Sequence, residues 1–222
     1  MRLKNFPEVV KTILKPLPKK DYPVLDTFSF VSVWLQYVMD KSIVSMRDLF
    51  QRLNNQGDDG YQSTAQEMIE QNYPWVKWVA GPGKGPAANR NNGAKYATGE
   101  WLAFTDDDCL PDPQWLASYG EAIANNKSYL VFEGRTYVDR PRKNLAETSP
   151  INESGGYLWS CNFSMQRQLF ELLSGFDERF PYAAMEDVDL RLRLTKNRHK
   201  FLFIKTASVC HPWRHKGGWK KL

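Results

Sequence analysis

Short hydrophobic runs, each bounded by glycine, proline or polar residues, recur along the chain between longer segments with helical periodicity. The runs predict strands at 28–33, 75–80, 101–104, 129–132 and 201–204. The periodic segments predict helices at 63–71, 86–97, 115–124, 165–173 and 186–194. Because strands that alternate with helices build βαβ units, the pattern predicts an α/β fold with a mostly parallel central sheet flanked by helices.

Three consecutive carboxylates, Asp106, Asp107 and Asp108, follow the strand predicted at 101–104. In an open α/β sheet, ligands bind beyond the carboxyl ends of the strands, so we expect these acids at a binding edge. Adjacent acids repel one another unless a cation or hydrogen-bond donors offset their charge, and Mg²⁺ and Mn²⁺ prefer oxygen ligands. Taken alone, the pattern fits a divalent-cation site and a solvated acidic turn equally well.

Two other segments combine polar residues with the start of a predicted helix. Residues 81–86 are rich in glycine and precede the helix at 86–97, whose free amides suit an anion, although the loop matches no named phosphate-binding motif. The helix at 186–194 opens with Glu186, Asp187 and Asp189. Acids are favoured at this end by the helix dipole, so without the context of a motif an ordinary helix start is the preferred explanation.

Composition narrows the class of protein. The 222 residues are 42% hydrophobic, which is enough for a globular fold of one large domain or two small ones. The formal charge of +5 suits phosphate-bearing ligands or an anionic membrane surface as well as nucleic acid. The three cysteines have no CxxC spacing, so we expect neither a disulfide framework nor a structural zinc site. No apolar run approaches a transmembrane helix, and we expect a cytoplasmic protein.

With these pieces in place, residues 84–211 resemble the family-two glycosyltransferases of the GT-A fold. Residues 84–94 resemble the segment before that family's metal motif, and 103–108 resemble its strand ending in Asp-x-Asp. Residues 175–180, followed by 185–193, resemble its acceptor-side loop and Glu-Asp motif. The resemblance implies a GT-A (nucleotide-diphospho-sugar transferase), Rossmann-like domain at 28–222, with a nucleotide-binding half at 28–110 and an acceptor half at 111–222. A basic, proline-containing arm at 1–27 precedes it.

The resemblance also implies roles for the matching residues. Asp187 would be the general base with Glu186 beside it, and Asp108, Asp106 and His211 would bind Mn²⁺ or Mg²⁺. The implied nucleotide and donor contacts are Arg90, Asp106, Asp107, Lys84 and, in an acidic cluster at 58–60, Asp59.

The implied reaction is inverting, metal-dependent hexosyl transfer from a nucleotide-diphospho-sugar, most often a UDP-sugar, to the hydroxyl of a saccharide or lipid-linked acceptor. The basic aromatic tail at 211–222 is suited to clamping diphosphate or to peripheral contact with an anionic membrane. Nucleic acid is not an expected partner, because no named nucleic-acid module is visible.

The N-terminal third departs from the family pattern. Residues 28–34 stand where the family has a strand reading Ser-Val-Ile-Pro-Thr-Tyr-Asn, and 58–60 stand where it has Val-Asp-Asp-Gly-Ser. Both motifs normally hold the nucleobase. Two alternatives therefore stay open, a catalytically impaired relative and a nucleotidyltransferase. A frameshift across residues 31–62 would explain why the match to the family is poor in this stretch and good after it.

Overall fold

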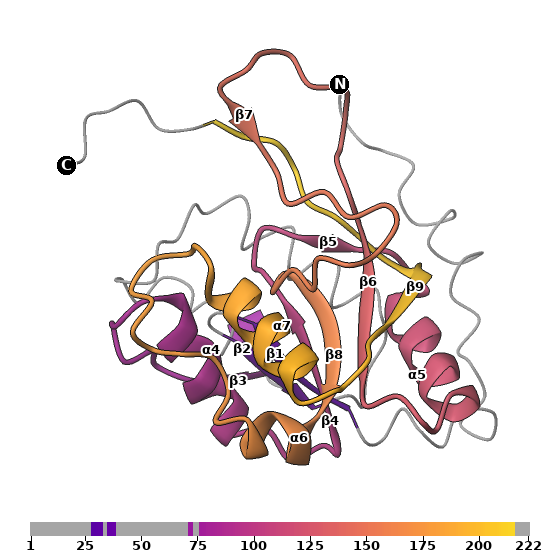
Figure 1. Cartoon of the computed structure of the whole chain (residues 1–222). Helices are drawn as coiled ribbons and strands as arrows, with labels where there is room; N and C mark the ends of the chain where they lie inside the picture. Colours follow the sequence, from indigo (N-terminus) through magenta and orange to yellow (C-terminus); the bar gives the residue numbers. More distant parts are fainter. Residues whose placement is uncertain (1–27, 33–34, 39–70, 73–75, 216–222) are drawn as a thin grey trace.

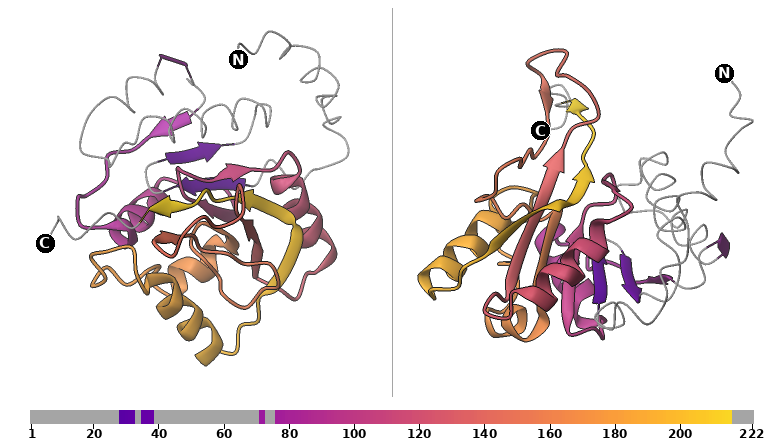
Figure 2. Two further views of the ribbon diagram at one scale, coloured as in Figure 1. Left: turned by 90° about the horizontal axis from the view of Figure 1, so that it is seen from above. Right: turned by 90° about the vertical axis from the view of Figure 1, so that its right-hand side faces the viewer.

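An eight-stranded sheet runs through the part of the chain that the computed structural model describes, residues 28–32, 35–38, 71–72 and 76–215. Its strand order is β3-β2-β1-β4-β8-β6-β9-β5, and a separate two-stranded sheet pairs β10 with β7. Figure 1 shows the arrangement of the elements, and Figure 2 shows α7 and α5 on opposite sides of β6. The strands are β1 (Phe28–Ser32), β2 (Leu35–Val38), β3 (Val76–Trp78), β4 (Trp101–Thr105), β5 (Leu110–Pro111), β6 (Val131–Tyr137), β7 (Glu147–Thr148), β8 (Asn162–Gln166), β9 (Leu202–Cys210) and β10 (Arg214–His215). The helices are α4 (Pro86–Lys95), α5 (Trp115–Asn125), α6 (Arg167–Leu172) and α7 (Glu186–Lys196).

The α/β class is as expected, but the prediction of a mostly parallel sheet is wrong for the described strands. Within the large sheet, β1 pairs with β4 and β6 with β9 in parallel, and the other neighbouring pairs are antiparallel. Two strands account for four of the five antiparallel pairs: β8 lies between β4 and β6 and runs against both, and β2 runs against β1 and β3. The chain reaches β8 from β6 through residues 138–161, which contain no crossover helix of the kind that a parallel return requires.

Every residue of β4 is buried because its side chains face two hydrophobic cores. Trp101 and Ala103 pack in a core with residues of α5, β6 and β9, whereas Leu102 and Phe104 pack with residues of α4, β8, α6 and α7. A strand covered on both faces carries a continuous hydrophobic run, which is the pattern that predicted it. This strand delivers Asp106 to the edge of the sheet.

A β-bulge extends the pairing of β6 with β9 toward the same edge. The register shifts after Gly134, where a Cβ would lie 2.2 Å from the carbonyl oxygen of Ala207 and 2.3 Å from Nδ2 of Asn162. Only glycine allows the two strands to approach this closely. Because both strands continue beyond the bulge, β9 reaches Cys210 and places His211 near the acids that follow β4.

Most predicted elements are present with altered limits. The strands predicted at 129–132 and 201–204 are longer, since β6 ends at 137 and β9 at 210. The helix predicted at 165–173 is wrong at its start, because 165 and 166 belong to β8 and α6 spans Arg167–Leu172. The strand β2 was not predicted.

Two of the sequence-based predictions fall largely outside the described residues, the helix at 63–71 and the arm at 1–27. The division into nucleotide-binding and acceptor halves stays a prediction. Among the helices of the described segments, none combines the length and the apolar character needed to cross a membrane.

Candidate active site

Arg90 joins two acids from distant parts of the chain. Its Nη2 donates to Oδ1 of Asp106, just beyond β4, and its Nη1 donates to Oε1 of Glu186, the first residue of α7, each over 2.8 Å. All three residues are buried. Burial works to raise the pKa of Asp106, but the Arg90 guanidinium outweighs it and holds the pKa of that carboxyl below its usual range. Arg90 therefore fixes the positions of two acids in the site.

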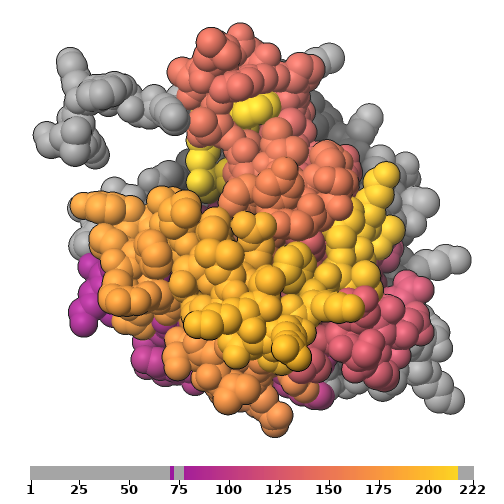
Figure 3. All heavy atoms as spheres, viewed as in Figure 1, coloured from indigo at the N-terminus to yellow at the C-terminus, as the bar shows by residue number. Residues whose placement is uncertain are grey.

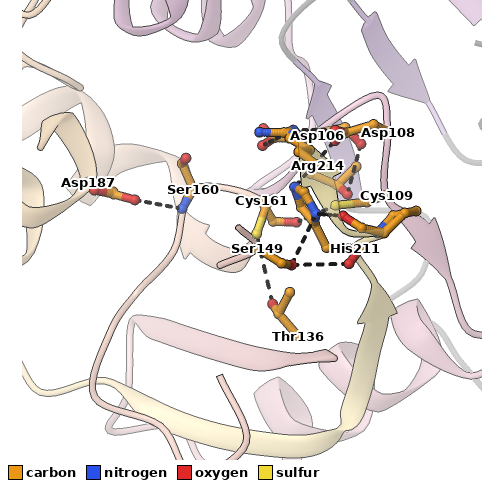
Figure 4. Close-up of polar contacts among 12 residues, drawn as sticks. Asp106, Asp108, Cys109, Thr136, Ser149, Ser160, Cys161, Asp187, His211 and Arg214 are labelled. Atoms are coloured by element: carbon orange, nitrogen blue, oxygen red, sulfur yellow. Dashed lines mark hydrogen bonds and ion pairs between the residues drawn. The ribbon is translucent and has the colours of Figure 1, made fainter. Parts of the chain in front are cut away.

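Asp108 and His211 face each other across a short buried gap (Figure 4). Nε2 of His211 lies 3.5 Å from Oδ1 of Asp108, and neither atom has a hydrogen-bond partner within the described segments. Nδ1 of the same ring lies 2.9 Å from the carbonyl oxygen of Pro212, which accepts only, so Nδ1 carries the proton in the neutral ring. Two buried acceptor atoms that face each other require a cation or a proton between them.

A divalent cation fits this pair of atoms. Carboxylate and imidazole are both ligands for Mn²⁺, and the Nδ1 hydrogen bond fixes the ring in the orientation that a metal ligand needs. The sulfur of Cys109 completes a group of three possible ligand atoms within 4.8 Å of one another. Burial raises the pKa of the Cys109 thiol well above its usual value, so the thiol stays protonated and is a poor ligand. Asp106, also expected as a ligand, directs one oxygen to Arg90, and the geometry favours Asp108 and His211.

Arg214 places a second cationic group at the acids, in addition to Arg90. It forms an ion pair with Asp108 and lies 3.8 Å from Asp106, while 48% of its side chain stays exposed. Its segment is held in place by the pairing of β10 with β7 and by the hydroxyl of Ser149, which donates to the carbonyl oxygen of His211 over 3.1 Å. Arg214 belongs to the part of the tail that the structure describes, residues 211–215, and the tail was expected to clamp diphosphate.

Within the described part of the chain, the middle acid Asp107 forms no ion pair, whereas Asp106 and Asp108 both do. Burial, together with the charges of Asp108 and Asp106, raises the pKa of Asp107 to about 7. Near neutral pH this carboxyl is therefore partly protonated, which relieves some of the repulsion among the three acids.

Asp187 lies on the far side of the segment that carries Ser160 and Cys161, as Figure 4 shows. Its Oδ2 accepts from the backbone N–H of Ser160 over 3.4 Å, and its Oδ1 accepts from the N–H of Val188 over 2.8 Å. Burial, and next the charge of Glu186, raise the pKa of Asp187. A raised pKa makes a carboxylate a stronger base near neutral pH, which is the property that proton abstraction requires.

The predicted site residues divide into three groups. The structure brings together Arg90, Asp106, Asp107, Asp108, Glu186, Asp187 and His211. Lys84 is exposed in the loop before α4 and makes no ion pair with these acids among the described residues. Asp59 lies outside the described residues.

Three contributors to the site were not predicted. Cys109 follows the acids directly, so its position was the only signal. Asn91 exchanges two 2.8 Å hydrogen bonds with the backbone of Phe176 and so ties α4 to the loop at 175–180. Ser160 acts through its backbone N–H, which leaves no trace in the sequence.

Most of the comparisons with known proteins point to one family. The model of glycosyl transferase family 2 matches residues 53–187, more than half of the chain. A chondroitin synthase of Escherichia coli is 24% identical over 170 residues, which are 73% of this chain and 24% of that protein. A shorter likeness, 57% identity over 56 residues, links 25% of this chain to 17% of a putative transposase for insertion sequence element IS4SA of a Synechocystis species.

Among solved structures, GalNAc-T7 with UDP, GalNAc and Mn²⁺ is similar with a TM-score of 0.55 and 18% identity, over 75% of this chain and 37% of that one. This likeness confirms the GT-A fold that the sequence predicted. The chain spans well under half the length of each of these three proteins.

Proposed function

This chain belongs to glycosyl transferase family 2, and we propose that it moves a hexose from a nucleotide-diphospho-sugar to an acceptor hydroxyl, with inversion at the anomeric carbon and with Mn²⁺ or Mg²⁺ as cofactor. One observation carries the proposal beyond the family. The buried, unpartnered acceptors of Asp108 and His211 face each other at the end of β4, with the Arg214 guanidinium beside them. A bound cation would offset the negative charge of Asp108, and a diphosphate would offset the positive charges of that cation and of Arg214.

Asp108 and His211 would hold the cation. When bound there, the cation supplies Lewis-acid stabilisation of the charge on the diphosphate. Arg214 would donate hydrogen bonds to the diphosphate oxygens, since its exposed guanidinium can turn from Asp108 toward a stronger anion. Arg90 keeps Asp106 in place throughout, because the pair is buried and closed by a 2.8 Å hydrogen bond.

Asp187 would act as the general base. The acceptor oxygen attacks the anomeric carbon while its proton passes to Asp187, and the bond from that carbon to the diphosphate oxygen breaks with its electron pair leaving on the diphosphate. Attack from the face opposite the leaving group inverts the configuration. The raised pKa of Asp187, caused first by burial and then by Glu186, supports this role.

The same arrangement favours glycosyl transfer over nucleotidyl transfer. A nucleotidyltransferase needs the metal and the phosphate contacts, but it gives no role to the pair of acids at the start of α7, Glu186 and Asp187.

We further propose a UDP-sugar donor and a saccharide or lipid-linked acceptor, in line with a structural neighbour solved with UDP and Mn²⁺. A cytoplasmic location with peripheral contact to an anionic membrane through the tail is part of the same proposal.

Titration calorimetry with UDP and GDP, in the presence of Mn²⁺ or of EDTA, tests the donor site. We expect UDP binding that needs Mn²⁺ and weakens at least about tenfold in Asp108→Asn, which loses a metal ligand. Glu171→Gln, which neutralises an exposed acid on α6, is the matched control and should bind as the unchanged protein does. Equal binding of UDP in EDTA would contradict the metal site.

One observation favours the second reading, an impaired relative. The family match begins at residue 53 and leaves residues 1–52 unmatched, and a separate likeness of 56 residues links this chain to a transposase. A segment of insertion-element origin at this position would explain why 28–34 lack the family's nucleobase motif. Under this reading the protein unfolds cooperatively but binds neither nucleotide, and sequencing the gene across the codons for 31–62 would show the junction. An uninterrupted reading frame shared with full-length relatives would remove it.

A further inference from the structure

Tyr157 and Trp159 form a stacked aromatic pair beside α7. Their ring centroids lie 5.2 Å apart with an interplanar angle of 16°. Tyr157 is 46% exposed, and Trp159 is half-buried with its Nε1 donating to the carbonyl oxygen of Ile151 over 3.1 Å. Trp159 packs against the core that contains Trp101 and Ala103, whereas Tyr157 stays exposed to water, where an aromatic ring gains little from packing.

The backbone between the two rings holds them in this position. Leu158 adopts a left-handed conformation with φ of 53°, which is costly for a residue with a branched side chain, and its own side chain is fully buried. The buried carboxylate of Glu133 accepts from the backbone N–H groups of Gly156, Tyr157 and Leu158 over 2.5, 3.2 and 3.0 Å. These bonds compensate for the strain and make the aromatic pair a rigid, preorganised surface.

The aromatic pair is attached to α7 on both sides. Arg191 donates to the carbonyl oxygen of Gly156 over 2.6 Å, and the N–H of Ser160 reaches Asp187 over 3.4 Å. Tyr157 and Trp159 lie between these two anchors, so the pair is next to the proposed general base. Figure 3 shows the atoms of this segment directly against those of α7 on one face of the molecule.

We propose that Tyr157 and Trp159 bind a pyranose ring of the acceptor, and that the acceptor is therefore a saccharide. The proposal rests on the function proposed above. A pyranose presents axial C–H groups on one face, and these weakly positive hydrogens complement the negative face of an aromatic ring. Ser160, the residue after Trp159, donates its backbone N–H to Asp187, so a sugar ring stacked on the aromatic pair would lie near that carboxylate. An acyl chain could also bury apolar surface on the aromatic pair, but unlike a sugar it has no hydroxyl group to offer Asp187.

Ligand-observed saturation-transfer NMR tests this with four probes, methyl β-glucoside, methyl β-galactoside and their 2-acetamido counterparts, with glycerol as a polyol that lacks a ring face. We expect saturation of at least one glycoside, strongest at the C–H groups of one face. In Tyr157→Ala the affinity for that glycoside should fall about fivefold or more. Tyr182→Ala, which removes a tyrosine that is 78% exposed on another loop, is the matched control.

Tyr157→Leu serves as a second variant, because it keeps the apolar volume and removes only the aromatic face. Weakened glycoside binding in this variant, with unchanged thermal unfolding, supports stacking. Unchanged glycoside binding in both variants overturns the inference, as does binding of octyl phosphate in place of the sugars. UDP titration of the same samples separates the two proposals. If UDP binds and no glycoside does, the acceptor inference alone fails, and if a glycoside binds through Tyr157 while UDP does not, the proposed transfer fails instead.

Discussion

Arg90 and Glu186 are separated by 96 positions in the sequence, yet Nη1 of the arginine lies 2.8 Å from Oε1 of the glutamate in a buried contact. The second oxygen of Glu186, Oε2, has no hydrogen-bond partner within the described ranges. The contact therefore joins α4 to α7, the helix that carries the proposed base. It satisfies only one of the two carboxylate oxygens of Glu186. This is a costly arrangement for stability, and it points to a role in the site.

Arg90→Met should destabilise the fold by about 3–5 kcal/mol, because it leaves Asp106 and Glu186 as buried acids without a cation. Urea denaturation at neutral pH measures this difference. Arg179→Met is the matched control, since Arg179 is 90% exposed and pairs with Asp177 at the surface, where solvent screens an ion pair and leaves it little effect on stability. Equal losses in the two variants would contradict the importance of the buried pair.

The rate of UDP-sugar turnover should rise with pH through the raised pKa of Asp187, because only the ionised carboxylate can accept a proton. Burial is the larger cause of that shift and the charge of Glu186 the next. Glu186→Gln removes the second cause, so the acidic limb of the pH–rate profile should move to lower pH. Release of UDP from UDP-glucose or UDP-N-acetylglucosamine, followed from pH 4 to 8, measures it. An unmoved limb would show that another group controls the rate.

Asp107 gives a pH effect on stability. Its folded pKa of about 7 exceeds the ordinary aspartate value, so between about pH 4 and 7 the folded chain holds a proton that the unfolded chain releases. This group's contribution is fully present below the unfolded pKa and is lost as pH rises through the folded pKa. In EDTA, the free energy of unfolding should therefore fall less steeply with pH in Asp107→Asn than in the unchanged protein. Parallel slopes in the two proteins would refute the assignment.

Arg214→Ala should have opposite effects on two ligands. It removes a cation that competes for Asp108, so Mn²⁺ alone should bind more tightly. It also removes a charge-assisted donor, so UDP in saturating Mn²⁺ should bind about tenfold more weakly. Calorimetry measures both constants. Arg142→Ala controls for charge, because the partners of Arg142 among the described residues are two backbone carbonyls and the ring of Trp213. Weaker binding of both ligands would mean that Arg214 mainly holds the fold.

Met185→Gly should stabilise the protein by about 0.5–1 kcal/mol. Met185 precedes α7 with φ of 75°, a left-handed conformation that costs a residue with a side chain roughly 1–2 kcal/mol, and 57% of the residue is exposed. Glycine adopts this conformation without strain, although it gains entropy when unfolded. Thermal unfolding measures the change. Leu192→Gly, at an exposed position inside α7, should instead destabilise by about 1 kcal/mol.

Local patterns account for the elements that could be predicted. β4 and α5 were predicted nearly to their ends because burial on two faces, or on one helical face, leaves a periodic hydrophobic signal. β9 was predicted only to Ile204, because the next residues, Lys205 and Thr206, are polar and exposed at the bulge. The direction of β8 has no local signal, since it depends on where a long connection returns.

The site divides in the same way. Asp108 follows a predicted strand, and Asp187 lies in the first turn of a predicted helix. The order of the motifs along the chain was therefore enough to identify both as candidate site residues. The pairing of Arg90 with both Asp106 and Glu186 spans most of the domain and was not foreseen, because sequence spacing carries no information on which charged groups meet. The tyrosine and tryptophan at 157 and 159 lack a motif altogether.

The contact between Ser160 and Asp187 uses the main chain of the serine. Selection acting on this contact therefore places almost no demand on the identity of the side chain at position 160, and nineteen of the twenty amino acids keep the donor. Proline alone removes it. A survey of natural variation would therefore not reveal this contact, although the amide there orients the carboxylate on which the proposed chemistry depends.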